Sequence, residues 1–252
     1  MNVKKLYDRL AEIIPSELSE EWDNDGIMCA ADFSAEVNNV LVALDVTEEI
    51  VDYAISRKFD LIISHHPLIF KPINRVTEEN HTQRKLIKLL ANNVSVFSFH
   101  TRLDKVAGGV NDVLAEKIGL CDVMPFGDGL GRIGTLSEET TLEDFAETVK
   151  ESLGADGVRY ADAYNPVKRI ALVGGDGKGY VESAMLAGAD TYVSGRIGYN
   201  VMEEASELGI NLLEAGHYFT EFPITSYLAS LVSSLDGNAY VEIADSNAIK
   251  LV

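Results

Sequence analysis

The stretch VLVALDVTEEIVDYAISRKFDLIISHHP, residues 40–67, shows how the chain is built. Two short apolar runs rich in β-branched residues, 40–44 and 61–63, flank a segment with helical periodicity. Thr47 can cap this helix, and two glutamates follow it in the first turn, where the helix dipole favours acidic side chains. A strand, a helix and a second strand in this order are typical of a βαβ unit with parallel strands.

The same alternation continues along the rest of the chain, so the sequence predicts an α/β fold with mostly parallel sheets. Further strands are expected at 94–99, 133–136, 158–161, 170–173, 191–193 and 212–213. Helices are expected at about 83–91, 142–153, 180–187, 201–208 and 220–235.

An internal repeat relates the two halves of the chain. An offset of 130 residues pairs Val51 with Val181, Asp60 with Asp190 and Ser64 with Ser194. An offset of 117 then pairs His100 with His217 and Asp104 with Glu221. We therefore predict two similar α/β lobes, residues 1–123 and 124–252, each of which delivers one element of the pattern His-x-x-x-acid.

Composition excludes several classes of protein. The 252 residues include 21 Lys and Arg against 40 Asp and Glu, a formal net charge of −19, which disfavours nucleic-acid and anionic-membrane partners. No apolar run approaches the roughly 20 residues that a membrane helix needs. Residues 1–18 are typical of an amphipathic helix and not of a signal peptide. Because two cysteines cannot form a disulfide framework, we expect a reducing, cytoplasmic location.

Four of the five histidines lie where a predicted strand ends: His65, His66, His100 and His217. Ligands of open α/β sheets bind at the carboxyl ends of the strands, so these imidazoles are candidate site residues. Pro67 cannot continue a strand ladder, and the exit that it creates can turn His65 and His66 toward one cavity. The alternative is a pair of partly exposed loop histidines.

Two acidic residues accompany these histidines. Asp104 follows His100 and is either a candidate ligand or an ordinary solvated loop acid. Pro223 predicts that the last long helix begins near Thr220, which places Glu221 in its first turn and His217 in the preceding loop. A capped helix start and a surface histidine are the alternative for this second pair.

Together these residues fit a metal site. Imidazoles and carboxylates suit Zn²⁺, Mn²⁺ and Fe²⁺, and three or four histidines with two acids supply enough donors for two ions that share a bridging carboxylate. Asp45 could orient a ligating imidazole, although we favour it as a cap of the following helix. We expect Trp22, the only tryptophan, in the core.

The glycine-rich run 174–179 follows a predicted strand, as a nucleotide-binding loop does. It lacks the spacing G-x-G-x-x-G, and Gly179 is followed by Tyr180 where a P-loop has Lys and then Ser or Thr. We interpret it as a tight turn between a strand and a helix. Ser64 and Ser194 lack the context of a nucleophile elbow, so the residues give little support to covalent catalysis.

Five motifs in order resemble the Nif-three-like dinuclear metal-binding family, whose members are often labelled GTP cyclohydrolase I type 2 homologues. They are Trp22-Asp23-Asn24-x-Gly26, Ala43-Leu44-Asp45-Val46-Thr47, Ser64-His65-His66-Pro67, His100-Thr101-x-x-Asp104 and Gly216-His217-x-x-Thr220-Glu221. The resemblance covers essentially the whole chain and matches the short form of the family, without an inserted domain.

The resemblance implies a site between the lobes that holds two divalent ions, with Zn, Mn or Fe the plausible metals. The implied ligands are His65, His66, Asp104, His217 and Glu221, with Glu221 as the bridge. His100 would be a nearby proton carrier. The resemblance also implies a metal-dependent hydrolase with a small-molecule substrate and a hexameric toroid. The alternative is a non-catalytic protein that binds, inserts or senses metal.

One region departs from the pattern of the family. Members often carry an acid after a small residue and Gly, and a His four residues beyond the acid. Here the positions are Ser194-Gly195-Arg196 and Asn200. Because the acidic surplus repels anions, an anionic substrate would need Lys178, Arg196 or the metals to receive it.

Overall fold

The computed structural model describes residues 1–250, which form two compact units. Unit 1 consists of Met1–Val106 and Ile224–Lys250, and unit 2 contains Ala107–Pro223. Within residues 1–250, no helix combines the length and the apolar character that crossing a bilayer requires.

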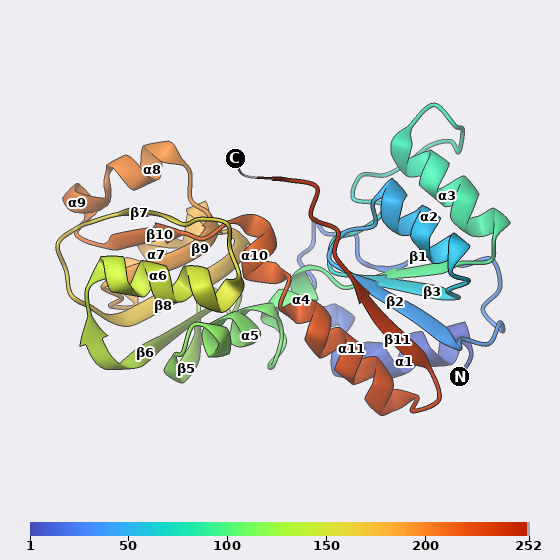
Figure 1. The fold of residues 1–252 in the computed structure, drawn as a ribbon, viewed down its shortest axis with the longest axis horizontal. Helices are drawn as coiled ribbons and strands as arrows, with labels where there is room; N and C mark the ends of the chain where they lie inside the picture. The colour runs from blue at the N-terminus through green and yellow to red at the C-terminus, as the bar shows by residue number, and fades with distance from the viewer. Residues whose placement is uncertain (251–252) are drawn as a thin grey trace. The chain divides into compact units, whose positions relative to one another are not determined.

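Unit 1 is a five-stranded sheet with helices on both faces (Figure 1). Its elements are α1 (Val3–Ile13), η1 (Ser16–Leu18), β1 (Gly26–Cys29), β2 (Asn39–Ala43), α2 (Glu48–Ser56), β3 (Leu61–Ser64), α3 (His81–Ala91), β4 (Ser95–Ser98), α4 (Thr101–Lys105), α11 (Ile224–Leu235) and β11 (Tyr240–Ala244). The strand order is β1-β4-β3-β2-β11, and only the β1–β4 pairing is antiparallel. In Figure 1, α2 and α3 cover one face, and α1 and α11 cover the other.

The central strands of unit 1 are buried on both faces, as their continuous apolar sequence predicts. Leu41 and Ile62 pack with α2 and α3. Val40 and Ile63 are also fully buried. Because parallel strands run in one direction, the carboxyl ends of β3 and β4 meet at one edge of the sheet, where His65, His66 and His100 follow.

Unit 2 is a six-stranded mixed sheet. Its elements are α5 (Val110–Lys117), β5 (Cys121–Phe126), β6 (Gly131–Thr140), α6 (Leu142–Leu153), β7 (Arg159–Ala161), β8 (Val167–Asp176), η2 (Lys178–Tyr180), α7 (Val181–Leu186), β9 (Thr191–Arg196), α8 (Tyr199–Glu203), α9 (Ala205–Leu208), β10 (Asn211–Glu214) and α10 (His217–Glu221). The order is β5-β6-β8-β9-β10-β7, with a parallel centre, β8-β9-β10, between antiparallel strands.

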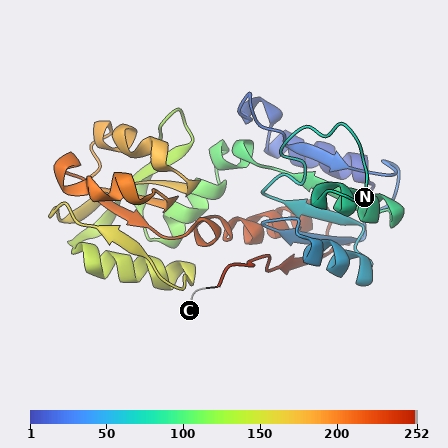
Figure 2. The ribbon, with the colours of Figure 1, turned by 90° about the horizontal axis from the view of Figure 1, so that it is seen from above.

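Helices also cover both faces of the unit 2 sheet. Leu172 and Val193 pack with α5 and α6, whereas Ala171 and Tyr192 pack with α7, α8 and α9. Figure 2 shows the yellow-green α6 on one side of this sheet and the orange α8 and α9 on the other. The prediction of an α/β protein with two similar lobes is confirmed, with more antiparallel pairing in unit 2 than the sequence indicated.

The two units repeat one arrangement of three parallel strands. In unit 1 the register aligns Val40 with Leu61 and Leu61 with Ser95. In unit 2 it aligns Ile170 with Thr191 and Thr191 with Asn211. Strands β2 and β3 of unit 1 are therefore related to β8 and β9 of unit 2 by the offset of 130 residues found in the sequence.

The end of the chain returns to unit 1, so the division differs from a single boundary at 123/124. Strand β11 pairs in parallel with β2, and α11 packs against both strands. Residues 107–123 lie with unit 2, because Leu114 and Ala115 of α5 belong to its core. Pairing of a distant edge strand explains why one boundary does not describe the units.

Candidate metal centre

His65 is the first residue after β3 and is fully buried. Its Nδ1 lies 2.9 Å from the carbonyl oxygen of Phe99, a geometry in which Nδ1 donates its proton to that oxygen. Its Nε2 lies 3.7 Å from Oδ1 of Asp104, which is on α4. A hydrogen bond that fixes the proton on Nδ1 leaves Nε2 as the electron-pair donor, the state that a metal ion requires.

His66 is half-buried, and Asp45 orients its ring. The Nδ1 of His66 lies 2.8 Å from Oδ1 of Asp45. Our preferred prediction, that Asp45 caps α2, is wrong, because the Thr47 side chain accepts the hydrogen bond from Ile50 N instead. The other interpretation holds, since Asp45 has the position of an acceptor that orients an imidazole.

His100 precedes α4 and is held by Asp23. Its Nδ1 lies 2.8 Å from Oδ1 of Asp23, whose Oδ2 accepts hydrogen bonds from the backbone and hydroxyl of Thr101. Burial by itself would raise the pKa of the Asp23 carboxyl, but these hydrogen bonds outweigh it and hold the pKa well below its ordinary value. Asp23 is therefore a carboxylate that favours a proton on His100 Nδ1.

The three imidazoles of unit 1 form one cluster. One ring nitrogen from each of His65, His66 and His100 lies within 4.8 Å of the others. The ring centroid of His65 lies 5.0 Å from that of His66 and 5.2 Å from that of His100. Both His65 and His66 have their Nδ1 engaged in a hydrogen bond, so the donor set fits a divalent transition ion through Nε2.

A buried arginine of α4 anchors this short helix to the rest of unit 1. Arg102 is 1% exposed, and its Nε donates to Oδ2 of Asp25 over 3.1 Å. It also donates to the carbonyl of Ile14, and its guanidinium lies 4.7 Å from the centroid of Phe99. A buried ion pair with further hydrogen bonds is costly to break, so this network fixes the short helix that carries Asp104.

Unit 2 contributes the second predicted pair. His217 is the first residue of α10 and Glu221 the last, with His217 Nε2 3.0 Å from Glu221 Oε2. The prediction that His217 hangs in a loop before a helix from Thr220 is wrong. A separate helical turn forms after Gly216, whose φ of +88° starts it, and Pro223 separates it from α11.

Glycines allow α10 to lie directly on β8 and β9. A Cβ added to Gly175 would lie 2.1 Å from Glu221 Oε1. A Cβ added to Gly195 would lie 2.6 Å from the Gly175 carbonyl oxygen and 2.7 Å from His217 Cα. The glycine-rich run thus contains the end of β8 and the turn into η2, and it makes room for the carboxylate.

The residues that depart from the family pattern lie at the edge of unit 2. Arg196 ends β9 and Asn200 lies in α8, and both are exposed. Lys178 is exposed, with its Nζ 4.0 Å from Asp176. The loop after Arg196 is anchored by Glu214, which accepts hydrogen bonds from the amides of Ile197 and Gly198.

We predicted Trp22 in the core, but the structure shows that it is 63% exposed. Its ring packs edge-on against Phe70 and against His100, with centroids 6.2 Å apart in each case. Phe70 and His100 also make an edge-on contact, at 6.1 Å. An exposed aromatic pair therefore borders the histidine cluster.

The sequence reasoning missed several residues that build these groups. Asp23 occurs within the motif that begins at Trp22, but nothing local in the sequence indicates the roles of Asp23, Asp25 or Arg102. Asp23 is 77 residues from His100 in the chain, so no local pattern signals their contact. The structure brings His65, His66, His100 and Asp104 together in unit 1 and pairs His217 with Glu221 in unit 2.

Known proteins similar to this chain span nearly its full length. The family model described as Duf34/NIF3 (NGG1p interacting factor 3) matches residues 1–250. A protein of Clostridium perfringens named GTP cyclohydrolase 1 type 2 homolog is 34% identical over 89% of this chain and 88% of its own length. A Lactococcus lactis protein of the same name is 33% identical over 94% of this chain and 93% of its own.

Solved structures give the same result for the fold. A hypothetical protein of Staphylococcus aureus has a TM-score of 0.92 at 29% identity, covering 100% of this chain and 99% of that one. Reduced HcgD from Methanocaldococcus jannaschii has a TM-score of 0.84 at 26% identity, covering 96% and 97% of the two chains.

Proposed function

We propose, from the premise that the chain belongs to the Duf34/NIF3 family, that the protein binds two divalent metal ions and is a metal-dependent hydrolase. The observation that carries the proposal is the cluster of three imidazoles in unit 1. The His–Glu pair of unit 2 supports it. The proposed ligands are His65, His66, Asp104, His217 and Glu221, with Zn, Mn or Fe as the metals.

The donor chemistry of each group suits this role. His65 and His66 are held as Nε2 donors by Phe99 and Asp45. Asp104 and Glu221 add negative charge, and a carboxylate can bridge two ions. A bound pair of divalent ions supplies a water of lowered pKa and polarises a carbonyl, imine or phosphoryl oxygen.

His100 is the residue that we propose to carry a proton. The Asp23 carboxylate accepts a hydrogen bond from His100 Nδ1, which fixes the ring and leaves Nε2 to give or take a proton. The pKa of Asp23 is held low, so the acceptor of this hydrogen bond is a carboxylate. A histidine oriented in this way can act as a general base and then as a general acid.

The name of the curated relatives suggests the first substrate to test. Hydrolytic opening of the purine ring of GTP is the reaction that the name implies. We further propose a small-molecule substrate, a cytoplasmic location and a homo-oligomer, a hexamer by resemblance to the family.

Metal content tests the proposal directly. Protein purified without a histidine tag is analysed by mass spectrometry for metals, next to the variants His66→Ala and Glu221→Ala. We expect about two ions per wild-type chain and a marked loss in both variants. His81→Ala is the matched control, because His81 begins α3 outside the cluster. Less than one ion per wild-type chain, or unchanged metal in both variants, would contradict the assignment.

Turnover separates the hydrolase from the non-catalytic alternative. The metal-loaded protein is assayed against panels of nucleotides, phosphoesters and amides. Turnover that Asp104→Ala abolishes supports the hydrolase. Retained metal with no turnover on any panel favours a metal-binding, metal-insertion or regulatory protein instead.

A further inference from the structure

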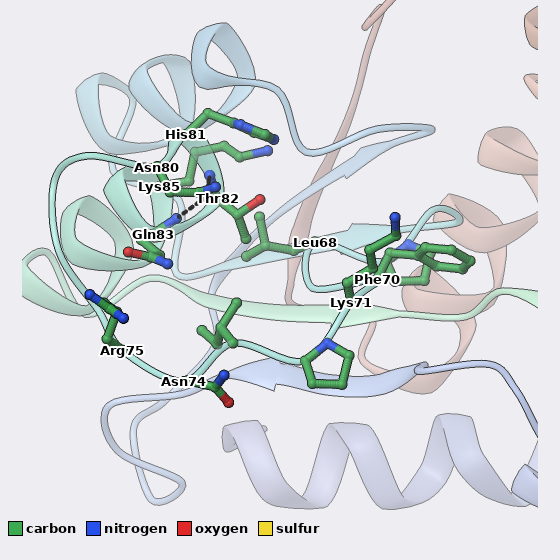
Figure 3. Close-up of a pocket in the computed structure, with 13 residues that line it drawn as sticks. Leu68, Phe70, Lys71, Asn74, Arg75, Asn80, His81, Thr82, Gln83 and Lys85 are labelled. Atoms are coloured by element: carbon green, nitrogen blue, oxygen red, sulfur yellow. Dashed lines mark hydrogen bonds between the residues drawn. The ribbon is translucent and has the colours of Figure 1, made fainter.

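A cavity lies in unit 1 directly beyond the paired histidines. It has a volume of about 580 Å³ and is formed by the loop that follows His66 and by the first turns of α3 (Figure 3). Leu68 and Ile73 supply apolar wall, and Thr82 and Gln83 supply polar groups. A cavity of this size and mixed lining is of the kind that binds small molecules.

The lining of this cavity is basic. Lys71, Arg75, His81 and Lys85 are among its 13 residues, and none of the 13 is acidic. Figure 3 shows His81 and Lys85 together on the α3 side and Lys71 beside Phe70 on the loop side. In a chain with 40 acidic and 21 basic residues, a site without any acid is contrary to the general charge. Local positive potential of this kind attracts anions.

The basic residues of the cavity differ from their neighbours on α3. Arg84 pairs with Glu48 over 2.9 Å, and Lys88 pairs with Asp52 over 2.6 Å. Within residues 1–250, neither Lys71 nor Arg75 lies within ion-pair distance of an acidic side chain. Lys71 and Arg75 are thus available to a ligand, whereas Arg84 and Lys88 have acidic partners in the protein.

Two further features favour an anion. Helix α3 begins at the cavity, and the positive end of its dipole adds to the local potential. Lys85 is partly buried, with its Nζ 2.5 Å from the carbonyl oxygen of Val46. Burial lowers the pKa of Lys85, and the charges of Glu48 and Asp45 oppose this only in part, so an anion placed nearby would further offset the cost of keeping its charge.

Phe70 connects the cavity with the histidine cluster. Its side chain lines the cavity and also packs edge-on against His100. The loop that carries Phe70 begins at His66, one of the proposed metal ligands. A ligand anchored by one end in the cavity could therefore extend past Phe70 to the imidazoles.

We propose that this cavity is the subsite for the anionic group, a phosphate or a carboxylate, of the molecule on which the histidine cluster acts. The assignment rests on the proposed function for the reacting end of that molecule. Lys71 and Arg75 bind the anion, and Lys85 supports it from the wall. The proposed substrate is then a small molecule whose anionic group lies in the cavity and whose reacting atom lies beyond Phe70, at the histidine cluster.

Anion binding by metal-free protein tests the subsite separately from the metals. Chelator-treated protein is titrated with pyrophosphate and, in a second series, with citrate, by isothermal titration calorimetry. The variant Lys71→Gln/Arg75→Gln is compared with Lys5→Gln/Arg9→Gln, which removes two exposed cations of α1. We expect binding to weaken about tenfold or more in the cavity variant and to stay unchanged in the control.

The two series identify the anion, because preference for pyrophosphate indicates a phosphate and preference for citrate a carboxylate. Equal affinity of the wild type and the cavity variant for both probes, or no saturable binding, would overturn the proposal. Metal content of the cavity variant should equal that of the wild type. If the wild-type protein contains no metal but still binds the anion, only the proposed function is refuted. The two failures are therefore distinguishable.

Discussion

Replacing Gly175 with alanine is expected to displace the candidate metal ligands of unit 2 while the fold persists. The new Cβ would lie 2.1 Å from Glu221 Oε1 and 3.2 Å from His217 Nε2. The first distance is impossible between a methyl carbon and an oxygen atom, and the second is tighter than ordinary van der Waals contact. Both contacts are with the ends of side chains, so the carboxylate and the imidazole would move before the backbone does.

The energetic cost can be separated into two parts. Gly175 has a φ of +65°, and an L-residue with positive φ costs about 1–2 kcal/mol. Gly209 has a φ of +72° with nothing within 4 Å of an added Cβ, so Gly209→Ala measures that cost alone. We expect the two variants to lose similar free energy of unfolding, within about 1 kcal/mol of each other. Only Gly175→Ala should lose metal, with affinity at least about 100-fold lower, because a ligand is displaced.

Gly195→Ala provides the opposite case. Its Cβ would lie 2.6 Å from the carbonyl oxygen of Gly175 and 2.7 Å from His217 Cα, which are backbone atoms that cannot rotate away. This variant should therefore lose about 1–3 kcal/mol of unfolding free energy by overpacking, as well as metal.

Urea unfolding followed by circular dichroism gives the free energies, and competition with a chromophoric chelator gives the metal affinity. Wild-type affinity in Gly175→Ala, at normal stability, would show that Glu221 does not act as a ligand. Equal metal loss in Gly209→Ala would show that the effect comes from unfolding of the unit.

Two other substitutions test the supporting residues. Asp45→Ala should lower metal affinity about 10–100-fold, because it removes the acceptor for His66 Nδ1. Asp45→Asn keeps an oxygen at this position and should lose less affinity. Equal affinities of the two variants and the wild type in a chelator competition would contradict this prediction. Burial would raise the pKa of Glu214, but amides of Ile197 and Gly198 with Arg159 hold it below the ordinary value. The folded-state pKa is thus the lower one, so this stabilisation is complete above about pH 4.5 and is lost as the pH falls through the folded-state value. The difference in melting temperature between wild type and Glu214→Gln should shrink from about pH 6 to pH 3, and a constant difference would refute the reasoning.

The sequence was sufficient to locate the histidine cluster, because its signal is local. His65, His66 and His100 follow runs of buried β-branched residues, and parallel strands bring such positions to one edge. The prediction that Asp45 caps α2 is wrong for a physical reason. An aspartate at this position can cap a helix or accept from an imidazole, and the presence of Thr47 as an alternative cap leaves it for His66.

The rest of the site depended on contacts that are distant in the chain. Asp23 reaches His100 across 77 residues, and Arg102 reaches Ile14 across 88. Strand β11 was missed because an edge strand with partly exposed residues has no continuous apolar run. The core position predicted for Trp22 is wrong, because an aromatic residue at a rim can remain exposed when it packs by its edge on other rings.

The internal repeat preserves one scaffold feature in both units. Asp60 accepts hydrogen bonds from the amides of residues 38 and 39, and Asp190 accepts them from the amides of residues 168 and 169, again at an offset of 130. These carboxylates hold the starts of β2 and β8 against the turns that precede β3 and β9. They belong to the scaffold, at the ends of the strands away from the histidines.

The opposite ends have diverged. In unit 1, strand β3 is followed by His65 and His66, whereas the positions 130 residues later, Gly195 and Arg196, are the last two residues of β9 in unit 2. Gly195 cannot be a ligand, but it admits the backbone of His217 at a distance that a side chain would forbid. The unit without paired histidines thus uses the equivalent position to bring α10 close to the sheet, which is why its candidate ligands lie one helical turn apart and not on two strands.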